Sequence, residues 1–140
     1  MDSREVTEKL AKVPMFSGCT KRELDAIARA AKEVKHPEGH VIALEGDRGV
    51  GFFLITEGTA RVSIGGKPRS KLGPGDFFGE IALLDRGPRT ATVTSTSPIR
   101  LLGLTAWVFR GLIEEHPSIG FKLLEVVAGR LREASKDTTS

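Results

Sequence analysis

Cysteine is almost absent from this chain, because Cys19 is the only one among its 140 residues. A single thiol cannot form an internal disulfide, which excludes a disulfide-stapled secreted scaffold and favours a cytoplasmic location. The charged first five residues also lack the apolar segment of a secretory signal. With one cysteine and three scattered histidines, the chain has too few clustered ligands for a structural zinc site, so we expect no metal.

Long apolar runs are also missing. The longest, residues 50–55, is far short of the roughly 20 residues that a membrane-spanning helix needs. Hydrophobic residues make up 39% of the chain and charged residues 28%, which is typical of one soluble globular domain. The 21 Lys and Arg residues are interleaved with 18 Asp and Glu residues, so the net charge of +3 does not indicate a nucleic-acid-binding stripe.

Glycine is absent from the first 17 residues, whereas eleven of the 16 glycines lie between Gly39 and Gly87. This distribution predicts helical ends around a turn-rich middle. The capping box Thr20-x-x-Glu23 belongs to the N-terminal helices, which we place within residues 1–32. Thr105 as an N-cap and Pro117 in a first turn predict two C-terminal helices within residues 105–134, followed by a disordered tail at 135–140.

Between these ends, short apolar segments alternate with turn residues, as in a chain of β-strands. Eight strands are predicted, at residues 33–36, 40–44, 52–56, 60–64, 69–72, 76–78, 90–96 and 99–104. The pairs Glu57-Gly58 and Gly65-Gly66 are typical of tight hairpin turns. The predicted fold is mainly β with flanking helices (α+β), an eight-stranded jelly-roll β-barrel over residues 33–104 within a single domain of residues 1–140.

Residues 78–93 interrupt this β pattern with a short apolar turn that we expect to be helical. Gly79 has no side chain, so the backbone can approach whatever binds there. The amides of Ile81 and Ala82 follow at the start of the turn, where unpaired N–H groups attract an anion. The segment therefore predicts an anion site made of backbone donors.

Arg89 adds a guanidinium nine residues after Glu80, and Pro88 fixes the direction from which it returns. Thr90 adds a hydroxyl beside it. Amides, a guanidinium and a hydroxyl together make a cradle for a phosphate. The carboxylate of Glu80 is not a partner for the anion and suits a nearby sugar hydroxyl.

This segment resembles the phosphate-binding cassette of cyclic nucleotide-binding domains, whose pattern is Phe-Gly-Glu, two small or apolar residues, a spacer, then Arg and a small residue. Further matches follow in the family's order: Pro14-Met15-Phe16 before the Thr20 helix, Gly39-His40-Val41-Ile42, Glu45-Gly46-Asp47, Gly58-Thr59-Ala60-Arg61-Val62 and Gly73-Pro74-Gly75-Asp76. The resemblance covers about residues 10–132 of this sequence. The family includes catabolite activator proteins, and the cassette is most similar to those of cyclic nucleotide-gated channels and cyclic-nucleotide-dependent kinases.

The resemblance implies a role for each matched residue. Glu80 would hold the ribose 2′-hydroxyl, and Arg89 would hold the cyclic phosphate. Val62 and Leu72 would form an apolar wall under the purine, while the last helix would close as a lid with Arg130 over the base. The nucleotide-binding residues implied in this way are Val62, Leu72, Phe78, Gly79, Glu80, Ile81, Ala82, Arg89, Thr90 and Arg130, with Leu131 or Ala134 near the base.

Other chemistry finds less support in the residues. A cupin enzyme needs a metal held by clustered His and Glu, whereas His36 and His40 flank a turn and His116 is far away in the sequence. We interpret these histidines as surface residues and Cys19 as a buried, inert thiol. The sequence therefore does not predict an enzyme.

The predicted function is that of a cytoplasmic receptor domain for a cyclic purine nucleotide, signalling by ligand-induced movement of its C-terminal helix. We expect cAMP in preference to cGMP. Thr90 leaves cGMP open, because a hydroxyl there also serves the guanine amino group in channel-type and kinase-type domains.

Two alternatives to this function remain. One is a protein-interaction module that has kept the fold. The other is a regulatory domain cut from a larger DNA-binding regulator, channel or kinase, an alternative suggested by the end of the sequence soon after the last helix. Met1 and the polar tail favour a standalone protein. No nucleic-acid or membrane partner is expected for this chain alone, its effector protein is unknown, and a homodimer is one alternative for its assembly.

Overall fold

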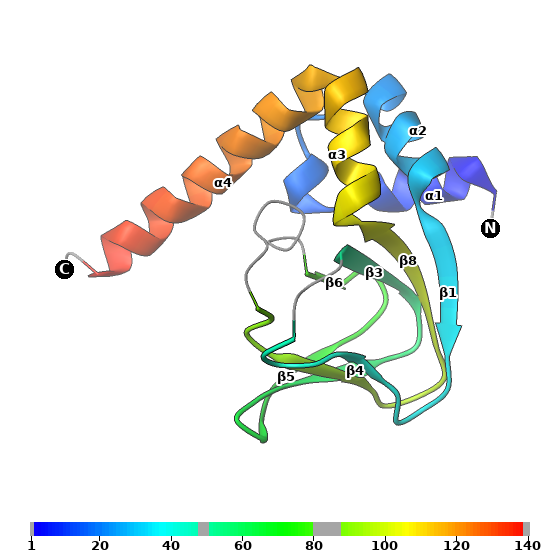
Figure 1. The fold of residues 1–140 in the computed structure, drawn as a ribbon, viewed down its shortest axis with the longest axis vertical. Helices are drawn as coiled ribbons and strands as arrows, with labels where there is room; N and C mark the ends of the chain where they lie inside the picture. Colours follow the sequence, from blue (N-terminus) through cyan, green and yellow to red (C-terminus); the bar gives the residue numbers. More distant parts are fainter. Residues whose placement is uncertain (1, 48–50, 80–87, 139–140) are drawn as a thin grey trace. The chain divides into compact units, whose positions relative to one another are not determined.

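A computed structural model describes residues 2–47, 51–79 and 88–138 (Figure 1). The chain divides into two compact units. One is a β unit, Ala30–Phe109, and the other is a helical unit that combines Met1–Arg29 with Arg110–Ser140. Each unit is described below by itself.

The β unit contains the eight predicted strands, each close to its expected position. They are β1 (Lys32–His36), β2 (Val41–Ala43), β3 (Gly51–Glu57), β4 (Ala60–Ile64), β5 (Lys67–Leu72), β6 (Phe77–Phe78), β7 (Thr92–Ser95) and β8 (Ile99–Thr105). They form two four-stranded antiparallel sheets, with the orders β1-β8-β3-β6 and β2-β7-β4-β5. This arrangement confirms the predicted jelly roll.

One of the two predicted hairpins is wrong. The Gly65-Gly66 turn does join a paired hairpin, β4 with β5, in which Ile64 lies opposite Lys67. The Glu57-Gly58 turn instead carries the chain from β3 in one sheet to β4 in the other. Gly58 has φ of +89°, and a Cβ on it would collide with the carbonyl oxygen of Pro98. Tight packing against this neighbouring segment therefore shapes the turn, not a local hairpin.

The core of the β unit draws on both sheets, so it lies between them. Its buried members come from six strands and are Ala43, Ile55, Ala60, Phe78, Val93, Ile99 and Leu101, with Val34, Ile42, Phe53, Val62 and Leu72 packed against them. The alternation of side chains along each strand directs these residues inward. Val62 and Leu72, two of the predicted nucleotide contacts, therefore belong to the inner surface of the roll.

The connection between β1 and β2 is fastened by one buried hydroxyl. Ser95, 2% exposed, donates from Oγ to the carbonyl of Pro37 at 2.6 Å and accepts from the His40 amide at 2.9 Å.

The rings of His36 and His40 stack with centroids 3.9 Å apart. Burial, and then the neighbouring His40, lower the pKa of His36. Among the described residues no group of three His, Cys, Asp or Glu side chains is placed to hold a metal ion.

The helical unit and its junction with the β unit contain α1 (Ser3–Ala11), a 3₁₀ turn η1 (Pro14–Phe16), α2 (Lys21–Ala30), α3 (Ala106–Glu115) and α4 (Pro117–Thr138). The predicted caps are present. Thr20 and Glu23 form the reciprocal capping box, and Thr105 Oγ1 accepts from the Val108 amide at 3.2 Å. No helix of the described residues is both long enough and apolar enough to cross a membrane.

The end of α4 corrects the predicted disordered tail. The helix continues to Thr138, so residues 135–138 are helical. These residues are polar, which suggested disorder, but they contain neither Gly nor Pro to end the helix. Residues 139 and 140 lie outside the described part of the chain.

The corner at Gly58 gives a test of the fold. Gly58 and Gly75 have nearly equal φ angles, +89° and +91°, but a Cβ on Gly75 would meet nothing within 4 Å. Gly75→Ala should lower the free energy of unfolding by only about 1–2 kcal/mol, because alanine is strained in the left-handed region. Gly58→Ala should lower the free energy of unfolding by about 1–3 kcal/mol more than Gly75→Ala does, because the added methyl group overlaps Pro98. Urea unfolding of both variants measures this difference. Equal decreases in the free energy of unfolding would contradict the close contact between Gly58 and Pro98.

Candidate functional site

The backbone of Arg89 is held by two hydrogen bonds. Its amide donates to the carbonyl of Asp47 at 2.7 Å, and its own carbonyl accepts from the Gly46 amide at 2.9 Å. These bonds tie the end of the predicted cassette to the turn after β2. The direction in which the side chain leaves the backbone is therefore set by a segment more than 40 residues earlier.

The Arg89 side chain is anchored as well. Its Nη2 donates to the carbonyl oxygen of Gly51, the first residue of β3, at 2.7 Å. A carbonyl is a neutral acceptor, so this bond orients the guanidinium without cancelling its positive charge. Arg89 is half-buried, which limits the dielectric screening of that charge. The arrangement suits an oriented cation that receives an anion.

Gly79 lies against this guanidinium. Its φ is +83°, and a Cβ added to it would collide with Arg89 Nη1 and would lie 2.5 Å from the carbonyl oxygen of Gly51. Only glycine fits, for both reasons. The sequence predicted that the backbone at Gly79 approaches a bound ligand, and this stays a prediction. In the structure, the groups beside Gly79 are the Arg89 guanidinium and the Gly51 carbonyl.

Phe78, the residue before Gly79, belongs to the core. It is 9% exposed, and its ring centroid lies 5.4 Å from that of Phe53 on β3. β6 pairs with β3 through this same Phe53–Phe78 position. Packing of Phe78 thus fixes the position of Gly79 at the start of the cassette.

The structure describes only some of the other predicted site residues. Glu80, Ile81 and Ala82 lie outside the described residues. Thr90 is exposed, one residue beyond the anchored Arg89. Arg130 is a residue of α4, and its side chain also lies outside the described part.

Val62 and Leu72 lie on one face of the second sheet. Leu72 is opposite Ala60, and Val62 is opposite Val93. Because Ala60 and Val62 are two residues apart on β4, all four side chains point to the same side. Val62 and Leu72 are only partly buried, so each keeps surface that a flat apolar ligand can cover.

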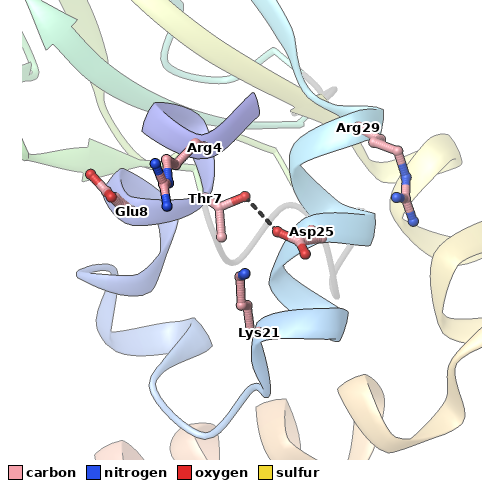
Figure 2. Close-up of a pocket in the computed structure, with 6 residues that line it drawn as sticks. All are labelled: Arg4, Thr7, Glu8, Lys21, Asp25 and Arg29. Carbon is pink, nitrogen blue, oxygen red and sulfur yellow. Dashed lines mark hydrogen bonds between the residues drawn. The ribbon is translucent and has the colours of Figure 1, made fainter. Parts of the chain in front are cut away.

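A separate cleft of about 480 Å³ lies in the helical unit between α1 and α2 (Figure 2). Figure 2 shows its lining to be polar, and Thr7 donates to Asp25 at 2.9 Å. The lining residues are Arg4, Thr7, Glu8, Lys21, Asp25 and Arg29. None of them is a predicted nucleotide contact, and all six are polar or charged residues, whereas most small-molecule sites are lined mainly by apolar side chains.

Cys19 is half-buried in the same unit. Burial, and then the charge of Glu23, raise the pKa of the Cys19 thiol. The reactive thiolate is therefore disfavoured, which agrees with the interpretation of Cys19 as an inert residue.

Sequence reasoning missed Gly51 and the Gly46-Asp47 turn as the partners of Arg89. The Glu45-Gly46-Asp47 motif was noticed only as a family match, and a carbonyl acceptor leaves no signal in a sequence. What brings these groups together is strand pairing, which places the start of β3 beside β6 and β8.

Comparison with known proteins agrees with this geometry. Residues 33–116 match the family model of the cyclic nucleotide-binding domain. The chain is 31% identical over 137 residues to a CRP-like cAMP-activated global transcriptional regulator of Mycobacterium tuberculosis, covering 93% of this chain and 60% of that protein. It is 39% identical over 112 residues to the cAMP-dependent protein kinase regulatory subunit of Neurospora crassa, covering 79% of this chain and 29% of the subunit.

A solved structure shares the fold along most of its length. The N-terminal domain of a transcriptional regulator from Streptomyces coelicolor A3(2) superposes with a TM-score of 0.82 at 28% identity, covering 89% of this chain and 90% of that one. The present chain spans less than two thirds of the two curated relatives. With a family match across more than half of its residues, the chain belongs to the cyclic nucleotide-binding domain family.

Proposed function

We propose that this domain binds cAMP and acts as a cytoplasmic sensor, by conformational change and not by catalysis. The observation that carries the proposal is the guanidinium of Arg89, fastened to the carbonyl of Gly51 beside Gly79. An oriented, half-buried cation next to a side-chain-free backbone suits a phosphate diester. The names of the relatives support cAMP as the ligand, since one is a cAMP-activated regulator and another a cAMP-dependent kinase subunit.

The proposed binding mode assigns the phosphate to Arg89, the Ile81 and Ala82 amides, and the Thr90 hydroxyl. A guanidinium carries five N–H donors in one plane, so the side chain of Arg89 has the geometry to contact two phosphate oxygens together. Glu80 would accept a hydrogen bond from the ribose 2′-hydroxyl. In these assignments the phosphate oxygens meet hydrogen-bond donors and the ribose hydroxyl meets an acceptor.

The purine is assigned to the partly buried face of Val62 and Leu72, with α4 closing over it through Arg130. Apolar side chains on one side and a helix on the other would exclude water from the base. Because cAMP has about 22 non-hydrogen atoms and each contributes roughly −0.3 kcal/mol, micromolar affinity is expected. A hydroxyl at Thr90 also suits the amino group of guanine, so cGMP is expected to bind, more weakly than cAMP.

A homodimer through α4 is proposed for the assembly of the domain. Phe121, Leu124 and Leu131 of α4 are 72%, 62% and 64% exposed. Together with exposed Ala128 they are spaced by three, four and three residues, the spacing of a coiled-coil seam. Exposed apolar surface of this kind marks an interaction site, and a second copy carries the same stripe.

The first prediction from the proposed function tests the phosphate site by calorimetry. Arg89→Ala should weaken cAMP binding by at least about tenfold, because a guanidinium–phosphate pair contributes about 1.5–3 kcal/mol. Arg89→Lys should recover only part of the loss, since an ammonium cannot contact two phosphate oxygens in one plane. Arg100→Ala is the matched control, because Arg100 pairs with Glu33 and Glu57 on the β unit and is not a predicted contact. Equal affinities for all variants would refute the site.

The second prediction tests the ribose contact. The 2′-deoxy analogue of cAMP removes the hydroxyl assigned to Glu80 and leaves that carboxylate without its partner near a phosphate. Its affinity should fall below that of cAMP, and Glu80→Gln should narrow the difference between the two nucleotides. If the unmodified protein binds both equally well, Glu80 has no part in ribose recognition.

The third prediction concerns assembly and is measured by sedimentation velocity. The protein should sediment as a dimer, whereas Leu124→Ser combined with Leu131→Ser should give a monomer, because the seam loses its two leucines. Glu125→Ser combined with Arg132→Ser changes exposed polar residues of the same helix and should remain dimeric. A monomeric unmodified protein at calorimetric concentrations would refute this assembly.

A further inference from the structure

Glu23, near the N-terminus of α2, bonds to α4 as well as to its own helix. Its carboxylate accepts from the Thr20 amide at 2.7 Å, which completes the capping box of α2. The same carboxylate accepts from the Ser118 hydroxyl and from Lys122 Nζ, the latter at 2.5 Å. Glu23 is only 6% exposed, so these bonds lie out of solvent.

The charge of Glu23 is strongly stabilised by these partners. Burial raises the pKa of its carboxyl, but the hydrogen bonds from Lys122, Ser118 and Thr20 outweigh burial and lower the pKa to about 2. Glu23 is therefore ionised at neutral pH. Separating it from Lys122 and Ser118 would leave a buried carboxylate with only its own cap, which is a costly state.

Apolar and steric contacts hold the same two turns of α4. Ile119 and Leu123 are fully buried, at 0% exposure. Gly120 passes close to Ile113 of α3, since a Cβ on Gly120 would lie 3.1 Å from the Ile113 side chain. The aliphatic part of Lys122 runs past Gly18, and α4 packs against η1. Residues 117–123 are therefore the attached base of α4.

Within one copy of the chain, most described side chains of α4 after Leu123 are exposed. Leu124 is 62% exposed and Leu131 is 64% exposed, and Ala128 and Gly129 are also exposed. Figure 1 shows this part of α4, in orange and red, running out beyond α1 and α2. Gly129 also lowers the intrinsic stability of the helix there.

These contrasts rule against one way for α4 to move. A swing of the whole helix about Pro117 would separate Glu23 from Ser118 and Lys122 and would expose Ile119 and Leu123. A bend after Leu123 breaks none of these contacts. The second movement therefore has much the lower free-energy cost.

We propose that Glu23 is a positioning residue that fastens residues 117–123 of α4 to α2, so that the ligand-dependent part of α4 begins after Leu123. The inference rests on the proposed function, in which α4 closes over bound cAMP. It refines the expectation from sequence that the C-terminal helix moves when the ligand binds. Glu23 does not touch the nucleotide and acts only through the helix that it holds.

Amide hydrogen exchange of the full chain, with and without cAMP, tests this assignment. In the unmodified protein, cAMP should slow exchange in residues 124–134 and leave residues 117–123 unchanged. Glu23→Gln should speed exchange of residues 117–123 by at least about tenfold in the nucleotide-free protein, because opening of this base becomes easier. Adding cAMP to Glu23→Gln should then slow amide exchange in residues 117–123 as well as in 124–134. The response to cAMP would thus begin earlier in α4, which a general loss of stability would not produce.

Glu125→Gln is the matched control, since Glu125 is an exposed carboxylate on the same helix. It should behave as the unmodified protein. If Glu23→Gln does not fold, Lys122→Met replaces it, because methionine keeps the contact past Gly18 and removes the cation. Unchanged exchange of residues 117–123 in the folded variant, or equal slowing of 117–123 and 124–134 by cAMP in the unmodified protein, would overturn the proposal.

The two proposals fail in different ways. If cAMP changes exchange nowhere and calorimetry detects no binding, the proposed function is wrong. The comparison of Glu23→Gln with Glu125→Gln without nucleotide still decides whether Glu23 holds the base of α4.

Discussion

The hydrogen bond from Arg89 to the carbonyl of Gly51 is the constraint on which the proposed site depends. A free arginine side chain has several rotatable bonds, and ordering it on ligand binding would reduce affinity. Here the backbone of Arg89 is pinned to the Gly46-Asp47 turn and its guanidinium to the start of β3. The cation is thus oriented by the β unit itself, and Gly79 is confined to glycine because the same space is already filled.

The core explains why this orientation is stable. Phe78 is buried against Phe53 in the layer between the sheets, and it directly precedes Gly79. The partly buried Val62 and Leu72 extend the same apolar layer toward the surface. The proposed site therefore has a floor made of core residues, with its polar groups where strands end. Binding residues on loops are commonly positioned by such a scaffold.

A second polar centre organises the helical unit. Glu23 joins the cap of α2 to the first two turns of α4, and its bonds compensate for the burial of a charge. Among the described residues that are not exposed, no buried side-chain nitrogen or oxygen lacks a hydrogen-bond partner. The protein therefore separates two tasks. The β unit holds an oriented cation, and the helical unit holds one end of a long helix whose other end is exposed.

The sequence by itself determined the elements of this protein. Turn residues and alternation located eight strands, and the caps at Thr20 and Thr105 located helices, because such signals depend on neighbours a few residues away. The order of cassette residues likewise identified the family. Tertiary structure alone decided that Glu57-Gly58 crosses between sheets, that Arg89 meets Gly51, and that Glu23 serves α4 as well as α2. These contacts join residues 38 to 99 positions apart, and such pairings follow from strand register and helix packing, which local patterns do not encode.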